Sequence, residues 1–153
     1  MADTFTQIYI QVIFAVQNRE SNIPKKNKEE LNKYLTGIIT NKGQKVIAIN
    51  GTTNHIHILL GLKPNIALSD LVRDTKSNSS AFVNHQNWLR GKFKWQEGFG
   101  GFSYGHSQLD KIINYITNQE QHHKRRSFKE EYLEFLDKFK VEYKKEYVFN
   151  FNI

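Results

Sequence analysis

Two histidines separated by a single residue form the pattern with the most chemical potential in this sequence. His55-Ile56-His57 lies in a strand-like apolar run. Alternate residues of a strand point to the same face, so the two imidazoles are expected to project together, about 6–7 Å apart. Two neutral imidazoles supply part of a divalent-metal site, while a pair of surface histidines on the open face of a sheet is the alternative. The spacing alone leaves both interpretations open.

The residues after this pair exclude several known kinds of His-x-His site. Leu59 stands where a histidine-triad hydrolase needs a third His, and Ile58-Leu59 stands where a metallo-β-lactamase-type site needs Asp-His. Residues 60–63 offer no Glu for a cupin site, and the second His-x-Thr or His-x-Ser motif of two-histidine phosphoesterases is absent. Each absence removes one interpretation of the histidine pair.

A helix predicted later in the chain offers a further candidate metal ligand. Its apolar stripe includes Ile112 and Ile116, and at 100° per residue Tyr115, Gln119 and His122 align in one column along the edge of this stripe. A tyrosine beside a core-facing stripe is more often a packing residue than a nucleophile. The Gln119 carboxamide, however, can supply the oxygen donor that two imidazoles leave missing from a metal site.

Basic and aromatic residues flank this helix. Lys124-Arg125-Arg126 follows it, and Lys92 and Lys94 precede it. Each cation alone is best interpreted as solvated surface, but with aromatic neighbours such cations are typical of a surface that stacks bases and neutralises phosphates. The aromatic residues suit a core equally well. They are Trp95, Phe99, Phe102 and Tyr104.

The elements that must position these residues follow from hydrophobic periodicity. Ser107 and Ser127 are predicted helix N-caps, and Glu130 completes a capping box with Ser127. The predicted strands are 8–16, 45–50, 55–62 and part of 93–104, with a short edge strand at 147–153, and the predicted helices are 27–41, about 69–83, 107–121 and 127–140.

The order of the first six elements is β-α-β-β-α-β, followed by C-terminal helices. This order predicts an α+β, ferredoxin-like (RRM-like) antiparallel sheet with helices on one face. Four glycines between Gly98 and Gly105 suggest a hinge before the tyrosine helix. Because this scaffold hosts many activities, the fold does not decide function.

The amino-acid composition limits the classes of protein to which this chain can belong. With 153 residues, 39% of them hydrophobic, the chain suits one domain spanning 1–153 rather than a disordered segment. The absence of cysteine excludes disulfides, thiolate metal sites and thiol nucleophiles. A net charge of +7 suits a polyanionic partner, although other basic proteins share it. No apolar run approaches a membrane span, so a cytoplasmic protein without a membrane partner is expected.

The combination of His-hydrophobic-His in a strand and Tyr-x-x-x-Gln on a later helix resembles the single-tyrosine HUH transposases of the insertion-sequence-200/605 type and their REP-associated relatives. The likeness extends to the opening strand 8–18, the stretch 95–99 and the run 115–123. Neither half of the motif pair is specific alone, but together they are.

The resemblance implies a metal-dependent DNA strand transferase. His55, His57 and Gln119 would hold one Mg²⁺ or Mn²⁺, and Tyr115 would be the nucleophile. The substrate would be single-stranded DNA with hairpin ends, cleaved to a 5′-phosphotyrosine and a free 3′-hydroxyl that later rejoins strands. Family members are homodimers. The candidate DNA-binding residues are Arg73, Lys76, Lys94, Trp95, Lys124 and Arg125.

Related enzymes fit less well. Replication initiators usually pair the tyrosine with a nearby Lys, where this chain has Gln119, and relaxases place the tyrosine before the histidines. Tyr104 is a rival nucleophile, but only Tyr115 shares a helix face with Gln119. Two other functions stay open: a non-catalytic module that binds single-stranded nucleic acid, and a metal-dependent hydrolase of small phosphoesters.

Overall fold

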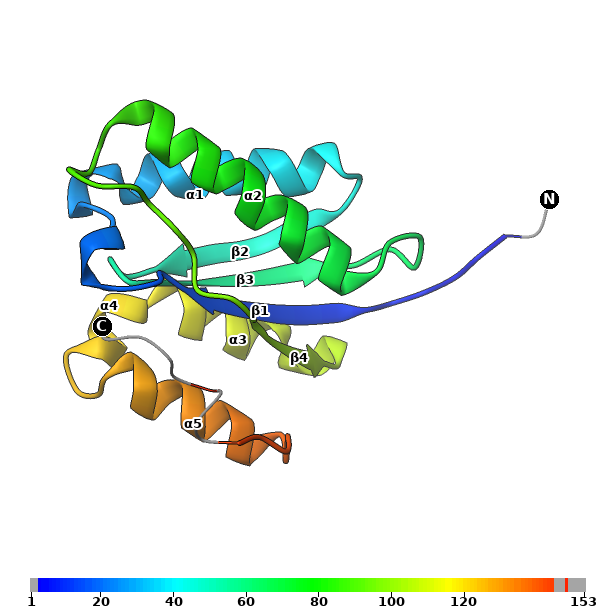
Figure 1. Ribbon diagram of the computed structural model, residues 1–153. Helices are drawn as coiled ribbons and strands as arrows, with labels where there is room; N and C mark the ends of the chain where they lie inside the picture. The colour runs from blue at the N-terminus through cyan, green and yellow to red at the C-terminus, as the bar shows by residue number, and fades with distance from the viewer. Residues whose placement is uncertain (1–2, 145–147, 149–153) are drawn as a thin grey trace.

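A four-stranded antiparallel sheet forms the centre of the molecule (Figure 1). The computed structural model describes residues 3–144 and 148. The strand order across the sheet is β2-β3-β1-β4, as the ferredoxin-like prediction requires. The strands are β1 (Tyr9–Ala15), β2 (Lys45–Gly51), β3 (His55–Gly61) and β4 (Gly100–Tyr104).

Helices cover both faces of this sheet (Figure 1). The two helices of the β-α-β-β-α-β unit pack on one face, and the C-terminal helices pack on the other, which the prediction had left uncovered. On the first face lie α1 (Lys28–Asn41) and α2 (Leu68–Gln86), and on the second lie α3 (Leu109–Thr117), α4 (Gln119–His123) and α5 (Phe128–Lys138). No helix among the described residues is long and apolar enough to cross a membrane.

The sheet separates two hydrophobic cores because successive side chains of each strand point to opposite faces. Ile56 and Ile58 of β3 join the core under α1 and α2, whereas Leu59 joins the core under α3 and α5. His55 and His57 share the side of Leu59 and are 2% and 0% exposed. The interpretation of the two histidines as surface residues is therefore wrong, since the C-terminal helices bury them.

The predicted third helix is divided into three parts. A 3₁₀ turn (His106–Gln108) precedes α3, and Asn118 lies between α3 and α4 with φ −102° and ψ 29°. The Asn118 side chain donates to the carbonyl of Asn114. Ser107 lies inside the 3₁₀ turn and caps neither element. The break turns the chain so that Gln119 starts a new, short helix.

The other predicted boundaries are mostly confirmed. Ser127 caps α5, because its hydroxyl accepts a hydrogen bond from the Glu130 amide at 3.2 Å. The hinge predicted between Gly98 and Gly105 is instead mostly a strand, since residues 100–104 form β4 and pair with β1. The edge strand predicted at 147–153 lies, apart from Val148, outside the described residues.

Candidate metal and nucleophile site

His55 and His57 lie side by side on β3, with ring centroids 5.2 Å apart. The two rings are held from behind by different groups. His55 Nδ1 lies 2.7 Å from Asn54 Oδ1, an oxygen that can only accept, so Nδ1 carries the proton. Burial lowers the pKa of His55 to about 4, which keeps the ring neutral. Its Nε2 therefore presents a lone pair to the interior of the site.

His57 is held by a glutamine from the neighbouring strand. Gln11 on β1 is fully buried, and its Nε2 donates to His57 Nδ1 at 2.8 Å. The Tyr104 hydroxyl donates to Gln11 Oε1 at 2.7 Å, which fixes the orientation of the amide. Tyr104, the rival nucleophile, thus lies behind His57 rather than beside its Nε2.

Gln119 reaches the site from the first turn of α4. Its Nε2 faces two acceptors, the Tyr115 carbonyl and Glu131 Oε2, each at 3.4 Å. Its Oε1 therefore points at His55 Nε2, at 3.2 Å. The break at Asn118 is what places this fully buried carboxamide against β3.

Tyr115 comes from the last turns of α3 and is half-buried. Its hydroxyl donates to Glu131 Oε2 and accepts a hydrogen bond from Arg126 Nη2 at 2.6 Å. Burial, together with the hydrogen bond to Glu131, holds the pKa of the phenol above its usual range, while Arg126 acts in the opposite direction. The ring stacks on His122 with centroids 4.3 Å apart. The structure thus brings Tyr115 and Gln119 against the two histidines of β3.

Two further residues of the site, Glu131 and His123, were not among the site residues predicted from the sequence. Glu131 of α5 is fully buried, and its Oε1 lies 3.0 Å from both His57 Nε2 and His123 Nε2 and 3.5 Å from His55 Nε2. Burial opposes its ionisation, but the contacts with the three imidazoles outweigh burial and hold the pKa of the carboxyl below its usual range. The available signal was its position, because Glu131 lies on the helix face that carries the buried Phe128 and Phe135.

The donor set fits a divalent cation. The lone pair of His55 Nε2 faces Gln119 Oε1 and Glu131 Oε1, and neither oxygen carries a hydrogen that it could donate. Buried acceptors that face one another without a donor are unfavourable unless a positive charge lies between them. One ligand atom each from His55, His57, His123 and Glu131 lies within 4.8 Å of the others. A metal ion at this point would satisfy the two acceptors His55 Nε2 and Gln119 Oε1, which face each other at 3.2 Å.

Comparison with known proteins identifies the family. Residues 4–119 match the family model described as "Transposase IS200 like", which is well over half of the chain. The chain belongs to the IS200-like transposase family. The matched region includes His55, His57, Tyr115 and Gln119 and ends before His123 and Glu131. No curated protein matches the chain in sequence.

Two solved structures share the fold of this transposase. One is a protein assigned as a transposase from Deinococcus radiodurans, with a TM-score of 0.61 and 21% identity, covering 78% of this chain and 95% of that one. The other is a REP-associated tyrosine transposase bound to a REP hairpin, with a TM-score of 0.55 and 15% identity, covering 77% of this chain and 72% of that one. At these identities the likeness shows the fold alone.

Four of the six candidate DNA-binding residues of the transposase border one hollow of about 530 Å³ between α2 and the loop 94–99. Arg73 and Lys94 are exposed there, and Lys76 Nζ donates to the backbone carbonyls of Gln96 and Gly98. Trp95 is only 8% exposed and donates to Ser79 Oγ, so its ring is part of the core. The remaining two candidates, Lys124 and Arg125, are exposed at the end of α4.

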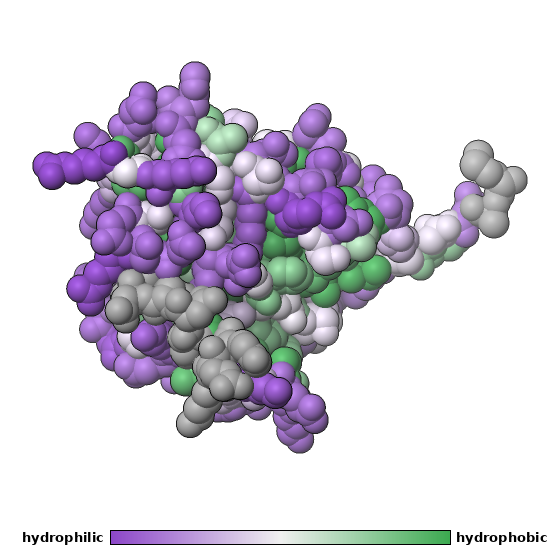
Figure 2. Space-filling model, in the orientation of Figure 1, coloured by the Kyte–Doolittle hydropathy of each residue, from purple (hydrophilic) through white to green (hydrophobic). Residues whose placement is uncertain are grey.

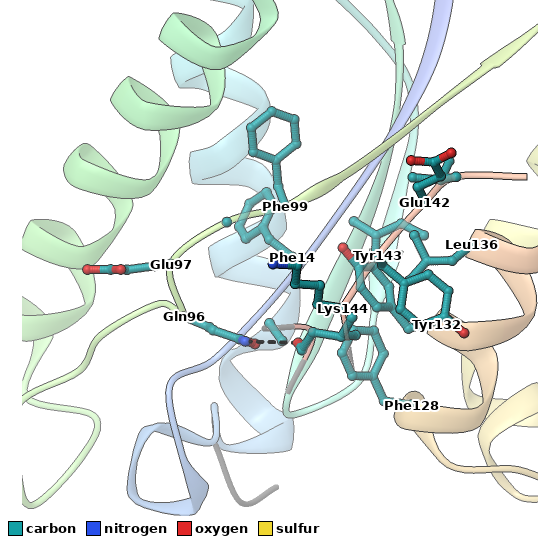
Figure 3. Close-up of a pocket in the computed structure, with 15 residues that line it drawn as sticks. Phe14, Gln96, Glu97, Phe99, Phe128, Tyr132, Leu136, Glu142, Tyr143 and Lys144 are labelled. Carbon is teal, nitrogen blue, oxygen red and sulfur yellow. Dashed lines mark hydrogen bonds between the residues drawn. The ribbon is translucent and has the colours of Figure 1, made fainter. Parts of the chain in front are cut away.

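Two other hollows lie on the side of α5. Figure 3 shows the first, about 270 Å³, where Phe99 and Tyr132 project from opposite walls; Phe128 also lines it and stacks on His55 at 4.2 Å. The second, about 360 Å³, is bordered by Tyr115, Arg126 and Lys138. The face seen in Figure 2 is mostly hydrophilic, and its hydrophobic area gathers near the base of the N-terminal segment.

Proposed function

We propose that this transposase cleaves and rejoins single-stranded DNA through a 5′-phosphotyrosine on Tyr115. His55, His57 and Gln119 would hold one Mg²⁺ or Mn²⁺. The observation that carries the proposal is the convergence of Tyr115 and Gln119, from α3 and α4, on the histidine pair of β3. Three of these four side chains are fully buried or nearly so, and a buried acceptor cluster of this kind suits a cation.

The covalent step is a transesterification at phosphorus. The Tyr115 oxygen forms a bond to the scissile phosphate, the bond from phosphorus to the 3′ oxygen breaks, and that oxygen takes up a proton to become a 3′-hydroxyl. The phenol proton has an acceptor in place at Glu131 Oε2. In the joining step a 3′-hydroxyl attacks the phosphotyrosine and releases the phenol. A phenol, with an ordinary pKa of about 10, is a moderate leaving group, so the exchange needs no ATP.

The surrounding residues suit this chemistry. A divalent metal in the cluster would polarise a non-bridging phosphate oxygen and take up developing charge. Arg126, which already donates to the Tyr115 oxygen, can stabilise negative charge on that oxygen when the phenol is released. The solved relative bound to a REP hairpin supports a hairpin substrate, and the net charge of +7 supports a nucleic-acid partner. We propose that the working form is a homodimer.

The test is covalent trapping with a library of single-stranded DNA hairpins that carry randomised flanks, in the presence of Mn²⁺. The wild-type chain is expected to form a protein–DNA adduct that survives denaturing electrophoresis. Tyr115→Phe should abolish the adduct and retain hairpin binding, whereas Tyr34→Phe, a matched change at an exposed tyrosine on α1, should leave it intact.

Three outcomes would contradict the proposal. An adduct in Tyr115→Phe at the wild-type level would show that another group is the nucleophile. A wild-type chain that binds hairpins and never forms an adduct would favour the non-catalytic binding module. Turnover of small phosphoesters without any protein–DNA linkage would favour the hydrolase.

A further inference from the structure

Glu131 occupies a position that hydrophobic packing does not explain. It lies on the inner face of α5 between Phe128, which stacks on His55, and Phe135, which contacts the rings of His57 and Tyr115. The carboxylate is fully buried, and the guanidinium of Arg126 lies 4.0 Å away from it. A buried carboxylate is costly unless it is paired or coordinates a metal. Three imidazole nitrogens surround its Oε1, and the Tyr115 hydroxyl donates to its Oε2.

The separations around Glu131 Oε1 match those between adjacent ligands of one metal ion. With bonds of about 2.1 Å, adjacent ligand atoms lie about 3.0 Å apart in octahedral geometry and about 3.4 Å apart in tetrahedral geometry. Oε1 lies 3.0 Å from His57 Nε2 and His123 Nε2 and 3.5 Å from His55 Nε2. Gln119 Oε1 lies 3.2 Å from His55 Nε2. These four distances match those between adjacent ligands, and the ligand atoms of His55, His57, His123 and Glu131 all lie within 4.8 Å of one another.

We infer that Glu131 and His123 are metal ligands in addition to His55, His57 and Gln119, and that the site selects a first-row transition ion such as Mn²⁺ over Mg²⁺. This inference rests on the proposed function, because that proposal supplies His55, His57 and Gln119 as ligands. Mg²⁺ prefers oxygen donors and keeps several of its waters, whereas three imidazoles with one carboxylate suit transition ions. The anionic ligand then comes from α5, beyond the region that matches the family.

This ligand also connects the metal site to the nucleophile. Glu131 Oε1 faces the imidazoles, while Oε2 accepts the hydrogen bond from the Tyr115 hydroxyl. A metal on Oε1 leaves Oε2 available to the tyrosine. One carboxylate thus sets both the charge of the metal site and the position of the tyrosine hydroxyl.

The test is calorimetric titration of the DNA-free chain with MnCl₂ and with MgCl₂. Wild type is expected to bind Mn²⁺ at least tenfold more tightly than Mg²⁺, and Glu131→Gln should weaken Mn²⁺ binding by about tenfold or more. The matched control is Glu130→Gln on the same helix, where the backbone amide that donates to Ser127 is retained and affinity should not change. Wild-type affinity in Glu131→Gln, or equal affinities for the two ions, would overturn the inference.

A second measurement does not depend on the folding of any variant. Pulsed EPR of the Mn²⁺-loaded wild type counts coordinated imidazole nitrogens: three are expected when His123 is a ligand, and two would overturn its assignment. Because neither measurement uses DNA, intact metal binding without adduct formation would remove only the proposed function. If instead the adduct forms, EPR counts two imidazoles and Glu131→Gln keeps the wild-type Mn²⁺ affinity, only this inference is removed.

Discussion

At the scale of single residues, the site depends on groups that lie behind the two imidazoles. Asn54 fixes the proton of His55 on Nδ1 and leaves Nε2 ready to bind a cation. His57 is arranged oppositely, because Gln11 donates to its Nδ1 and its own proton lies on Nε2, toward Glu131. Metal binding through His57 Nε2 therefore requires the proton to move to Nδ1. Gln11 must then turn its carboxamide so that the oxygen accepts from Nδ1.

Tyr104 makes this turn possible, because a hydroxyl can accept from the Gln11 amide as readily as it donates to it. We predict that Gln11→Leu lowers Mn²⁺ affinity by about 10- to 100-fold, as loss of such supporting partners typically does. Tyr104→Phe should cost less, since Gln11 stays available to His57. Calorimetry on both variants, with circular dichroism as the check on folding, measures the effect. Folded Gln11→Leu with wild-type affinity would show that His57 needs no support.

At the scale of elements, the short C-terminal helices decide whether the histidine pair is a site at all. The break at Asn118 places Gln119, and α5 places Glu131 between two aromatic side chains that hold the imidazoles. Neither position depends on β3 itself. The site is therefore expected to respond to changes at the ends of α5 that leave the sheet intact.

The N-cap of α5 allows a direct check of how much that end of the helix contributes to stability. Ser127→Ala should lower the free energy of unfolding by about 1 kcal/mol, because the Glu130 amide loses its acceptor. Ser107→Ala is the matched control, since Ser107 is exposed and caps no helix, and its effect should stay within about 0.5 kcal/mol. Urea unfolding of the metal-free chains measures both. Equal losses in the two variants would mean that the Ser127 cap adds no stability.

At the scale of the whole molecule, the sequence was sufficient to predict the elements with strong hydrophobic periodicity and to identify the motif pair. The alternation in β1 and β3 and the helical stripes of α1 and α2 predicted the ferredoxin-like order, which the structure confirms. What could not be predicted depends on tertiary contact. Glu131 lies on the apolar face of α5 with Phe128 and Phe135, but that position does not reveal its partners, which come only from the docking of α5 on the histidines. The break at Asn118 likewise follows from packing, because helical spacing continues through it.

Lys76 links α2 to the loop 94–99 and gives a prediction for pH. Burial lowers its pKa to about 8, with Glu97 acting in the opposite direction, against an ordinary value of about 10.4 in the unfolded chain. The unfolded state therefore binds more protons between these values, and stability contributed by this group rises as pH increases from about 8 to about 10.4. Urea midpoints of wild type should rise relative to Lys76→Met across this window. A constant difference between the two chains would contradict the shift.

Binding of DNA by the whole molecule should depend on salt in a way that locates the interface. Lys94 is exposed beside the hollow under α2, where Arg73 also lies, so it is available to a phosphate. Each phosphate contact on a single strand contributes about 0.7 to the slope of log affinity against log salt concentration. Lys94→Gln should therefore reduce the slope for a single-stranded hairpin by about that amount, as measured by fluorescence anisotropy. Lys26→Gln, at an exposed lysine on the short 3₁₀ turn before α1, should leave the slope unchanged. Equal slopes for wild type and Lys94→Gln would place the DNA elsewhere, with the exposed cations Lys124 and Arg125 at the end of α4 as the next candidates.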